Sequence, residues 1–319
     1  MIDTRDLRRD FHSENGTVHA VRGIDLSVSP GEVVALLGPN GAGKSTTLRM
    51  LTTLLPPTSG SAVVAGHDVG TEPVEVRRRI GYIGQGNGSF NGLRVQEELY
   101  TQARLYGLDR HTARRRTAEL LEQLQLADLS RRDVARLSGG QRRRLDIAMG
   151  IVHSPSLVFL DEPSAGLDPQ SRSNLWDHMD RMRREQDTTI VLTTHYLDEA
   201  DLVAERVVVI DHGTIIADGT PDELKSQVSG DLVALELMGV DDAASAADVA
   251  RAVPDAGEVS VDGTVVQLRV HHGDSTTPEL VRALDAAGVR LVATQVRRPS
   301  LDDVFLSLTG RSLREGEAA

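Results

Sequence analysis

The sequence contains no cysteine, only two lysines and no long apolar run. Without cysteine, the chain can form neither a disulfide framework nor a thiolate metal site, which fits a reducing interior. Its longest apolar runs, such as residues 33–37 and 207–210, are strand-length. A bilayer span needs roughly 18 apolar residues or more, and the first 16 residues lack the apolar segment of a signal peptide. We therefore expect that this chain does not cross a membrane alone.

Charge is the second constraint, because the 319 residues carry a formal net charge of −12. Nucleic-acid binding relies on a basic surface that neutralises phosphates, so this acidic balance argues against a nucleic-acid partner. Arginine nevertheless clusters at residues 77–79, 114–116 and 142–144. We expect these three runs to lie on solvated helix faces. The proportions of apolar and charged residues, 39% and 26%, are those of a globular protein.

Residues 1–222 alternate short apolar strands with longer amphipathic stretches, which predicts an α/β domain. The clearest strand candidates are Glu32–Leu37, Leu157–Leu160, Thr189–Leu192 and Arg206–Ile210. Residues 95–135 have apolar positions at helical spacing and no strand signal. This segment is predicted to be a helical insertion.

The composition changes after residue 221. Residues 221–319 contain 17 acidic and nine basic residues, a net charge of −8 within the total of −12. Over residues 230–310 the pattern predicts a strand, a helix, a hairpin turning at Asp262-Gly263, a helix at 278–287, a strand and a final helix from Ser300. This order predicts a small ferredoxin-like α+β domain. Residues 311–319 are expected to be a disordered tail.

A glycine-rich loop follows the first strand candidate and precedes a helical pattern. It fits the spacing G-x-x-x-x-G-K-[ST] and consists of Gly38, Pro39, Asn40, Gly41, Ala42, Gly43, Lys44, Ser45 and Thr46. Glycines let the backbone N–H groups converge on a phosphate, and the start of the helix adds its positive dipole end. Lys44 is expected to reach the β- and γ-phosphates and Ser45 to ligate Mg²⁺. The loop predicts a nucleoside triphosphate site.

A second apolar strand candidate, residues 157–160, is followed by Asp161 and Glu162. An open parallel sheet places its ligands at the carboxyl ends of its strands, so both carboxylates are expected beside the glycine-rich loop. Asp161 is predicted to hold Mg²⁺ and Glu162 to polarise an attacking water. The predicted reaction is therefore hydrolysis of the triphosphate.

Together these residues resemble the ATP-binding subunits of ABC transporters over residues 1–220. Leu137, Ser138, Gly139, Gly140 and Gln141 match the signature motif of that family. The resemblance implies that this motif completes the nucleotide site of a second subunit, so that two copies form a homodimer around two MgATP. Residues 142–144 then continue the signature helix on solvated or subunit-facing positions.

The resemblance also implies roles for single residues outside these motifs. Gln85 matches the loop glutamine that senses Mg²⁺ and the water, Asp168 the loop that crosses to the partner, and His195 the histidine that contacts the γ-phosphate. Phe11 is the candidate for stacking on adenine, with packing in the core as the alternative. Trp176 is expected in the core.

The similarity is closer to the daunorubicin-resistance type of drug-export ATPase. The supporting segments are VRRRIGYIGQ, QRRRLDIAMGIV, TTHYLDEAD, VVVIDHGTIIADGTPDELK and RRPSLDDVFLSLTG. The last one resembles the tail helix of these exporters' accessory domain, and the alternative is an amphipathic helix that only packs on its own domain. The resemblance implies ATP hydrolysis that powers efflux through a separate transmembrane permease, which would hold the chain at the cytoplasmic face of the membrane.

Two other functions remain open from the sequence. One is a non-transport ABC ATPase acting in regulation, translation or DNA repair. Such proteins usually have two nucleotide domains or long coiled-coil or zinc insertions, which this chain lacks. The other is an ATP sensor without catalysis, which the presence of Asp161, Glu162 and His195 disfavours.

Overall fold

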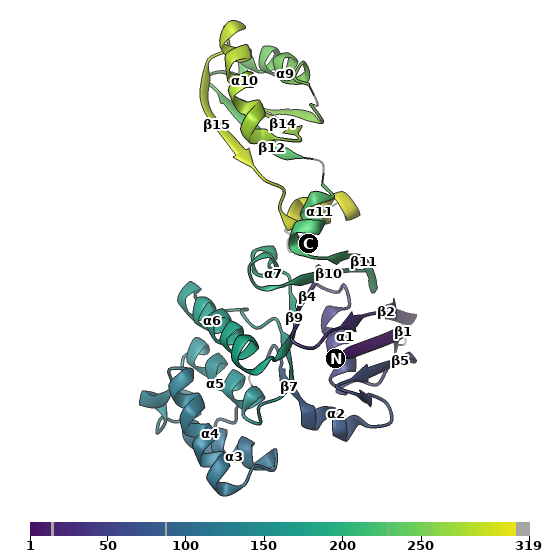
Figure 1. Ribbon diagram of the computed structural model, residues 1–319, viewed down its shortest axis with the longest axis vertical. Helices are drawn as coiled ribbons and strands as arrows, with labels where there is room; N and C mark the ends of the chain where they lie inside the picture. Colours follow the sequence, from purple (N-terminus) through teal and green to yellow (C-terminus); the bar gives the residue numbers. More distant parts are fainter. Residues whose placement is uncertain (14–15, 87, 229, 255, 311–319) are drawn as a thin grey trace. The chain divides into compact units, whose positions relative to one another are not determined.

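The computed structural model describes residues 1–13, 16–86, 88–228, 230–254 and 256–310 (Figure 1). Its contacts divide the chain into two compact units, one of residues 1–220 and a second that begins at Pro221. The predicted disordered tail at 311–319 lies outside the described residues.

A mostly parallel sheet forms the centre of the first unit. Its strand order is β11-β10-β4-β9-β8-β7, and all neighbours are parallel except the edge strand β11, which pairs antiparallel with β10. The strands are β4 (Val33–Leu37), β7 (Ile80–Ile83), β8 (Leu157–Asp161), β9 (Thr189–Thr194), β10 (Arg206–Asp211) and β11 (Thr214–Gly219). Every residue of β4, β8 and β9 is buried, as expected of a parallel sheet covered on both faces. The four strands predicted from apolar runs are confirmed, with ends shifted by two residues at most.

An antiparallel sheet from the N-terminal part of the chain packs beside this core and was not among the strand candidates. Its order is β2-β1-β5-β6, and β3 also pairs with β1. The strands are β1 (Ile2–Ser13), β2 (Gly16–Ile24), β3 (Ser27–Val28), β5 (Ser59–Val64) and β6 (His67–Asp68). Only three of the 12 residues of β1 are buried. The apolar pattern was therefore too sparse to predict this strand.

Helices cover the parallel sheet and form a separate helical region. Within residues 95–135 the structure has α3, α4 and two short 3-10 turns, so the helical insertion is confirmed. The helices of this unit are α1 (Lys44–Leu51), α2 (Pro73–Arg79), α3 (Val95–Leu105), α4 (Arg110–Gln123), η1 (Ala127–Leu129), η2 (Val134–Arg136), α5 (Gly139–Ile151), α6 (Pro169–Gln186) and α7 (Leu197–Val203). In Figure 1, α3, α4 and α5 lie together, away from β1, β2 and β5.

The second unit has the predicted βαββαβ order. Its antiparallel sheet is ordered β13-β14-β12-β15, and α9 and α10 pack on one face of it around a separate apolar core. The elements are α8 (Pro221–Ser226), β12 (Asp231–Leu237), η3 (Val240–Asp242), α9 (Ala243–Arg251), β13 (Val259–Asp262), β14 (Val265–Val270), α10 (Gly273–Ala286), β15 (Leu291–Arg297) and α11 (Leu301–Thr309). This topology confirms the ferredoxin-like prediction.

One boundary in this unit was predicted wrongly. The helix expected at 278–287 begins at Gly273, and Pro278 lies inside it. Proline favours the first turn of a helix, which suggested a start near residue 278. A side chain distant in sequence fixes the true start, because the Gly273 backbone N–H donates to the Asp231 carboxylate over 2.8 Å.

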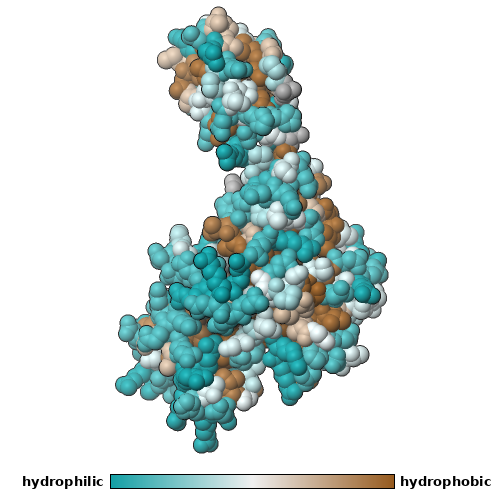
Figure 2. Space-filling view, viewed as in Figure 1, coloured by the Kyte–Doolittle hydropathy of each residue, from teal (hydrophilic) through white to brown (hydrophobic). Residues whose placement is uncertain are grey.

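The surface offers no broad apolar band on the face shown in Figure 2, where apolar patches are scattered among hydrophilic residues. Within the described residues, no helix combines the length and the apolarity that a membrane crossing requires.

Candidate functional site

The glycine-rich loop of residues 38–46, the predicted phosphate cradle, lies between β4 and α1 at the carboxyl end of the parallel sheet. Gly43 has a φ of +106°, and a Cβ atom there would lie 2.5 Å from the Ala20 carbonyl oxygen. This position therefore requires glycine on both conformational and steric grounds. The exposed or half-buried residues of the loop and first helical turn include Asn40, Gly41, Ser45 and Thr46.

Lys44 folds back over the loop that precedes it. Its ammonium group donates to the carbonyl oxygens of Gly38, over 2.6 Å, and Pro39, over 3.0 Å. The side chain is buried, and burial lowers its pKa, while the carboxylates of Glu162 and Asp161 oppose that shift. The lysine is thus a buried cation held beside two acidic groups.

Asp161 joins three elements at the end of β8. Its Oδ1 atom accepts hydrogen bonds from the hydroxyl of Ser45 on α1, over 2.8 Å, and from that of Thr193 on β9, over 2.7 Å. Asp161 is fully buried, and its Oδ2 atom has no hydrogen-bond partner among the described residues. A buried carboxylate oxygen without a donor is costly unless a cation or water satisfies it.

Glu162 follows directly in a left-handed conformation, with φ of +46°. Such a conformation costs a non-glycine residue about 1–3 kcal/mol and is concentrated at functional sites. The Glu162 backbone N–H donates to the Thr193 hydroxyl over 3.0 Å, and its Oε1 atom lies 3.3 Å from Nδ1 of His195. The structure therefore brings Lys44, Ser45, Asp161, Glu162 and His195 together, as the sequence predicted.

Two further predicted residues lie in loops around this cluster. Gln85 is exposed, two residues after the end of β7. Asp168 caps α6 and accepts hydrogen bonds from the backbone N–H and the hydroxyl of Ser171, over 2.9 and 2.7 Å. The hydrogen bond from the Ser171 hydroxyl has the larger effect on Asp168, and together with the bond from the Ser171 backbone N–H it lowers the pKa of this carboxyl group.

The signature motif forms the start of α5. Ser138 accepts from the Gln141 backbone N–H over 3.3 Å, and the Gln141 side chain accepts in return from the Ser138 N–H over 3.1 Å. This capping box fixes the helix start. A Cβ added at Gly139 would meet nothing within 4 Å, whereas one at Gly140 would lie 2.9 Å from the Ser171 hydroxyl. The motif therefore presents Gly139 to open space and rests through Gly140 on the start of α6.

Among the three arginines after the signature motif, Arg143 was predicted wrongly as solvated or subunit-facing. Arg143 is only 8% exposed. Its guanidinium group donates to the carbonyl oxygens of Pro163 over 2.9 Å and Gly84 over 2.5 Å, and burial lowers its pKa. Arg142 and Arg144 are half-buried, and they donate to Ser89 and to the Leu124 carbonyl oxygen.

Arg143 is thus a residue that sequence reasoning missed. It ties the signature helix to the residue before Gln85 and to the residue after Glu162. A run of three arginines was the only signal in the sequence, and it resembles the runs on exposed helices. Thr193 was missed as well, because its contact with Asp161 depends on the pairing of β8 with β9.

Phe11 lies on β1 opposite Val18 and is 39% exposed, with the Arg9 guanidinium 4.8 Å from the centre of its ring. The alternative of core packing is therefore wrong, and stacking on adenine stays a prediction. Trp176 is buried on α6, as expected.

Comparison with known proteins supports one family. The C-terminal residues 219–309 match the family described as "ATP-binding protein DrrA1-3-like, C-terminal domain", and residues 21–165 match "ABC transporter". A daunorubicin resistance ATP-binding protein, DrrA2 of Streptomyces coeruleorubidus, is 44% identical over 305 residues, which cover 95% of this chain and 94% of that protein. The chain belongs to the DrrA family of ABC transporter ATP-binding proteins.

A second relative agrees with this DrrA-family assignment, and a solved structure shares the fold. The daunorubicin/doxorubicin resistance protein DrrA of Streptomyces peucetius is 46% identical, over 97% of this chain and 92% of that protein. A dimeric bacterial ABC transporter cassette, MJ0796, superposes with a TM-score of 0.65 at 24% identity, over 69% of this chain and 98% of that one. The structural similarity concerns the fold of the first unit, and the DrrA-type match extends over the second.

Proposed function

We propose that this DrrA-family chain is the ATP-hydrolysing subunit of an exporter that drives efflux of a drug or another amphipathic compound through a separate membrane permease. The resistance proteins among its relatives support this substrate class. The chain would reach the cytoplasmic face of the membrane by binding the permease. The proposed partners are a second copy of this chain and the permease, and no nucleic acid takes part.

The observation that carries the proposal is the environment of Asp161. Its Oδ1 atom is already bonded to Ser45 and Thr193, while Oδ2 is buried without a donor. A hydroxyl and a carboxylate oxygen are the hard ligands that Mg²⁺ prefers, and this ion usually adds waters and phosphate oxygens to them. Ser45 and Asp161, with Gln85 from its loop, would hold Mg²⁺, which would neutralise charge on the phosphates.

The other residues act on the nucleotide and the water. The backbone N–H groups of Gly38 and residues 40–46 and the Lys44 ammonium would hold the β- and γ-phosphates. Glu162 would orient and polarise the attacking water, and His195, 3.3 Å from Glu162, would contact the γ-phosphate. Phe11 would stack on adenine. These roles require positioning and charge rather than a covalent intermediate.

The signature motif would complete the site of a second copy. Residues 138–141 offer a helix start with an open Gly139, and Asp168 lies beside them through Ser171. In a head-to-tail homodimer, the γ-phosphate in one cradle would contact the signature of the other copy. ATP then stabilises the closed dimer because it binds both chains, and hydrolysis removes that contact.

The first test is Glu162→Gln with ATP and Mg²⁺. We expect turnover to fall about 100-fold or more, while nucleotide binding persists and light scattering detects a stable dimer. Glu185→Gln, which changes an exposed glutamate of α6, is the matched control and should behave as wild type. Wild-type turnover in Glu162→Gln would refute the role of this carboxylate.

The transport role requires a separate experiment. Vesicles containing this chain bound to its permease should show daunorubicin-dependent ATP turnover, and the chain without a permease should not. If daunorubicin and a panel of amphipathic compounds leave turnover unchanged in the complex, the proposed substrate class is wrong.

A further inference from the structure

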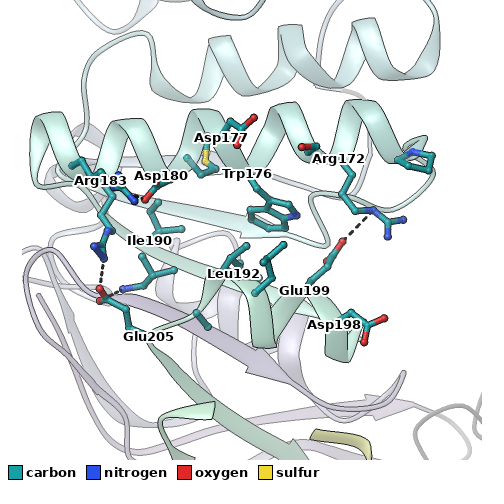
Figure 3. A pocket seen from close by; sticks show the side chains of 18 residues that line it. Arg172, Trp176, Asp177, Asp180, Arg183, Ile190, Leu192, Asp198, Glu199 and Glu205 are labelled. Atoms are coloured by element: carbon teal, nitrogen blue, oxygen red, sulfur yellow. Dashed lines mark hydrogen bonds and ion pairs between the residues drawn. The ribbon is translucent and has the colours of Figure 1, made fainter. Parts of the chain in front are cut away.

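A cavity of about 760 Å³ lies between α6 and α7, outside the cluster around Asp161 (Figure 3). Its apolar lining includes Trp176 and Met179 of α6 and Ile190 and Leu192 of β9. Pockets that bind small organic molecules usually measure about 300–1,000 Å³ and combine an apolar lining with a few polar groups. The size and lining of this cavity therefore suit a small molecule.

The indole of Trp176 is the first polar group in the cavity. The residue is only 8% exposed, and its Nε1–H has no hydrogen-bond partner among the described residues. Buried tryptophan N–H groups normally find an acceptor, and a buried donor without one costs about 1–3 kcal/mol. Figure 3 shows the ring projecting from α6 towards β9 and α7. This N–H is closed to solvent, so a ligand with an acceptor oxygen would satisfy it after a small turn of the indole towards the cavity.

The charges around the cavity favour a cation. Each of its three arginines pairs with a carboxylate of the same lining, and the pairs are Arg172 with Glu199, Arg183 with Glu205, and Arg184 with Asp180. Asp177 and Asp198 have no such partner among the described residues. Asp198 is the exposed residue in the otherwise buried first turn of α7, beside the Arg172–Glu199 end (Figure 3). The lining thus has five acidic and three basic side chains.

The same end of the cavity adjoins the loop of His195. Glu199 accepts a hydrogen bond from the hydroxyl of Thr194, over 3.0 Å, and Thr194 directly precedes His195. Arg172 lies over the ring of Tyr196, 5.3 Å from its centre. A molecule held between Trp176 and Glu199 would therefore lie beside Glu199 and Arg172. These two residues contact Thr194 and Tyr196, which flank His195 in the sequence.

We propose that this cavity binds an amphipathic organic cation with an aromatic body, which stacks near Trp176, accepts its N–H and places its positive charge beside Asp198. The site lies in the ATP-binding subunit itself, so it is distinct from a transport path through the permease. Binding itself is a separate property of this chain.

Trp176 makes the proposal directly measurable because it is the only tryptophan in the chain. The experiment titrates the full-length chain with berberine, a planar quaternary cation with ether oxygens, and follows tryptophan fluorescence. We expect saturable quenching. The anionic aromatic probe 1-anilinonaphthalene-8-sulfonate, titrated in the same way, should bind at least about tenfold more weakly, because an acidic rim repels it.

Variants locate the bound cation. Asp198→Asn changes an exposed side chain and should weaken berberine about threefold, the effect of one exposed charge contact. The matched control Asp128→Asn, on an exposed turn of the helical region, should have no effect. Trp176→Phe, followed through berberine's own fluorescence, should weaken binding about tenfold, provided that its melting curve shows a folded protein.

The proposal fails if berberine gives no saturable quenching, if the anionic probe binds as tightly, or if Asp198→Asn and Asp128→Asn have equal affinities. None of these measurements needs ATP, a permease or turnover. Failure here would therefore leave the role of Glu162 untouched, and loss of that role would not alter the titration.

Discussion

The two glycine-rich segments of the first unit use similar chemistry in opposite ways. In the cradle, polar groups turn inward: Lys44 donates to carbonyls of its own loop, and Ser45 donates to Asp161. In the signature motif, Ser138 and Gln141 satisfy only each other, and Gly139 faces open space. A helix start with free N–H groups favours an anion. The polar side chains of the cradle are thus paired within the chain, apart from Asp161 Oδ2, whereas the start of α5 is open at Gly139.

The strongest test of this difference mixes two inactive variants. Lys44→Ala removes the cradle cation, and Gly139→Asp adds a carboxylate that faces the open side of α5 without a steric clash. An acidic residue in the first turn suits a helix, so the fold should persist while the phosphate is repelled. Each variant alone should lose about 100-fold or more in turnover. Mixed together, they should regain a measurable part of the wild-type rate.

The recovery has a simple geometric reason. In a mixed dimer, the intact cradle of one chain meets the intact signature of the other, so one site is complete. Gly139→Asn, which has the same size without the charge, should lose less turnover than Gly139→Asp. A mixture no more active than the average of its components would show that each chain completes its own site.

The second test concerns the connection between the two segments. Arg143→Met keeps an unbranched side chain but removes the donors that bind the Gly84 and Pro163 carbonyls. We expect the free energy of unfolding to fall by about 2–4 kcal/mol. We also expect kcat to fall more than KM rises, because the neighbours of Gln85 and Glu162 lose their support while Lys44 is untouched. Denaturant titration and steady-state kinetics measure the two effects.

Arg136→Met is the control, since Arg136 is largely exposed in the turn before the signature motif. It should change neither quantity. A folded Arg143→Met protein with wild-type kcat would mean that this arginine is only a structural contact.

The arrangement of the cradle residues could be predicted from the sequence, but that of the signature motif and its contacts could be predicted only in part. Residues 38–46 and Asp161 follow buried strands, and the carboxyl ends of parallel strands meet at one edge of the sheet. Local pattern therefore sufficed to bring Lys44 and Asp161 together. The antiparallel strand β1 was missed because most of its residues are exposed.

The burial of Arg143 depended on information that is not local. Its partners Gly84 and Pro163 are 59 and 20 residues away in the sequence. No helical periodicity can show that their carbonyl groups lie beside α5. In the same way, the unpaired indole of Trp176 follows from how α6 lies on β9, and the sequence indicated only that this residue is buried.

The smallest expected effect is a pH dependence of the free energy of unfolding, which arises from a histidine packed behind the signature helix α5. His178 of α6 is 4% exposed, and neither ring nitrogen has a partner among the described residues. It lines a cavity of about 90 Å³ together with Arg144 and Ile147 of α5. Burial, helped by the positive charge of Arg181, lowers the pKa of His178 to about 4 from 6.5. The native protein therefore holds this histidine neutral.

The sign of the effect follows from the proton uptake of each state. Between pH 6.5 and pH 4 the unfolded chain binds a proton at His178 that the native chain excludes, so the free energy of unfolding falls as the pH is lowered. The full contribution of His178, up to about 3 kcal/mol, is present above pH 6.5 and is lost near pH 4.

His178→Met should remove this share of the pH dependence while leaving stability at pH 7 unchanged or higher, because no hydrogen bond is lost. Urea titrations of wild type and variant at pH 7, 6, 5 and 4.5 measure the difference. His111→Gln, at an exposed position of α4, should follow wild type, whereas the half-buried His153, with a pKa of about 4, retains its own share in every variant. If His178→Met and wild type lose stability in parallel as the pH falls, protonation of His178 does not weaken the packing of α6 against α5. The cradle and the signature motif would then differ only in the polar contacts of their own residues.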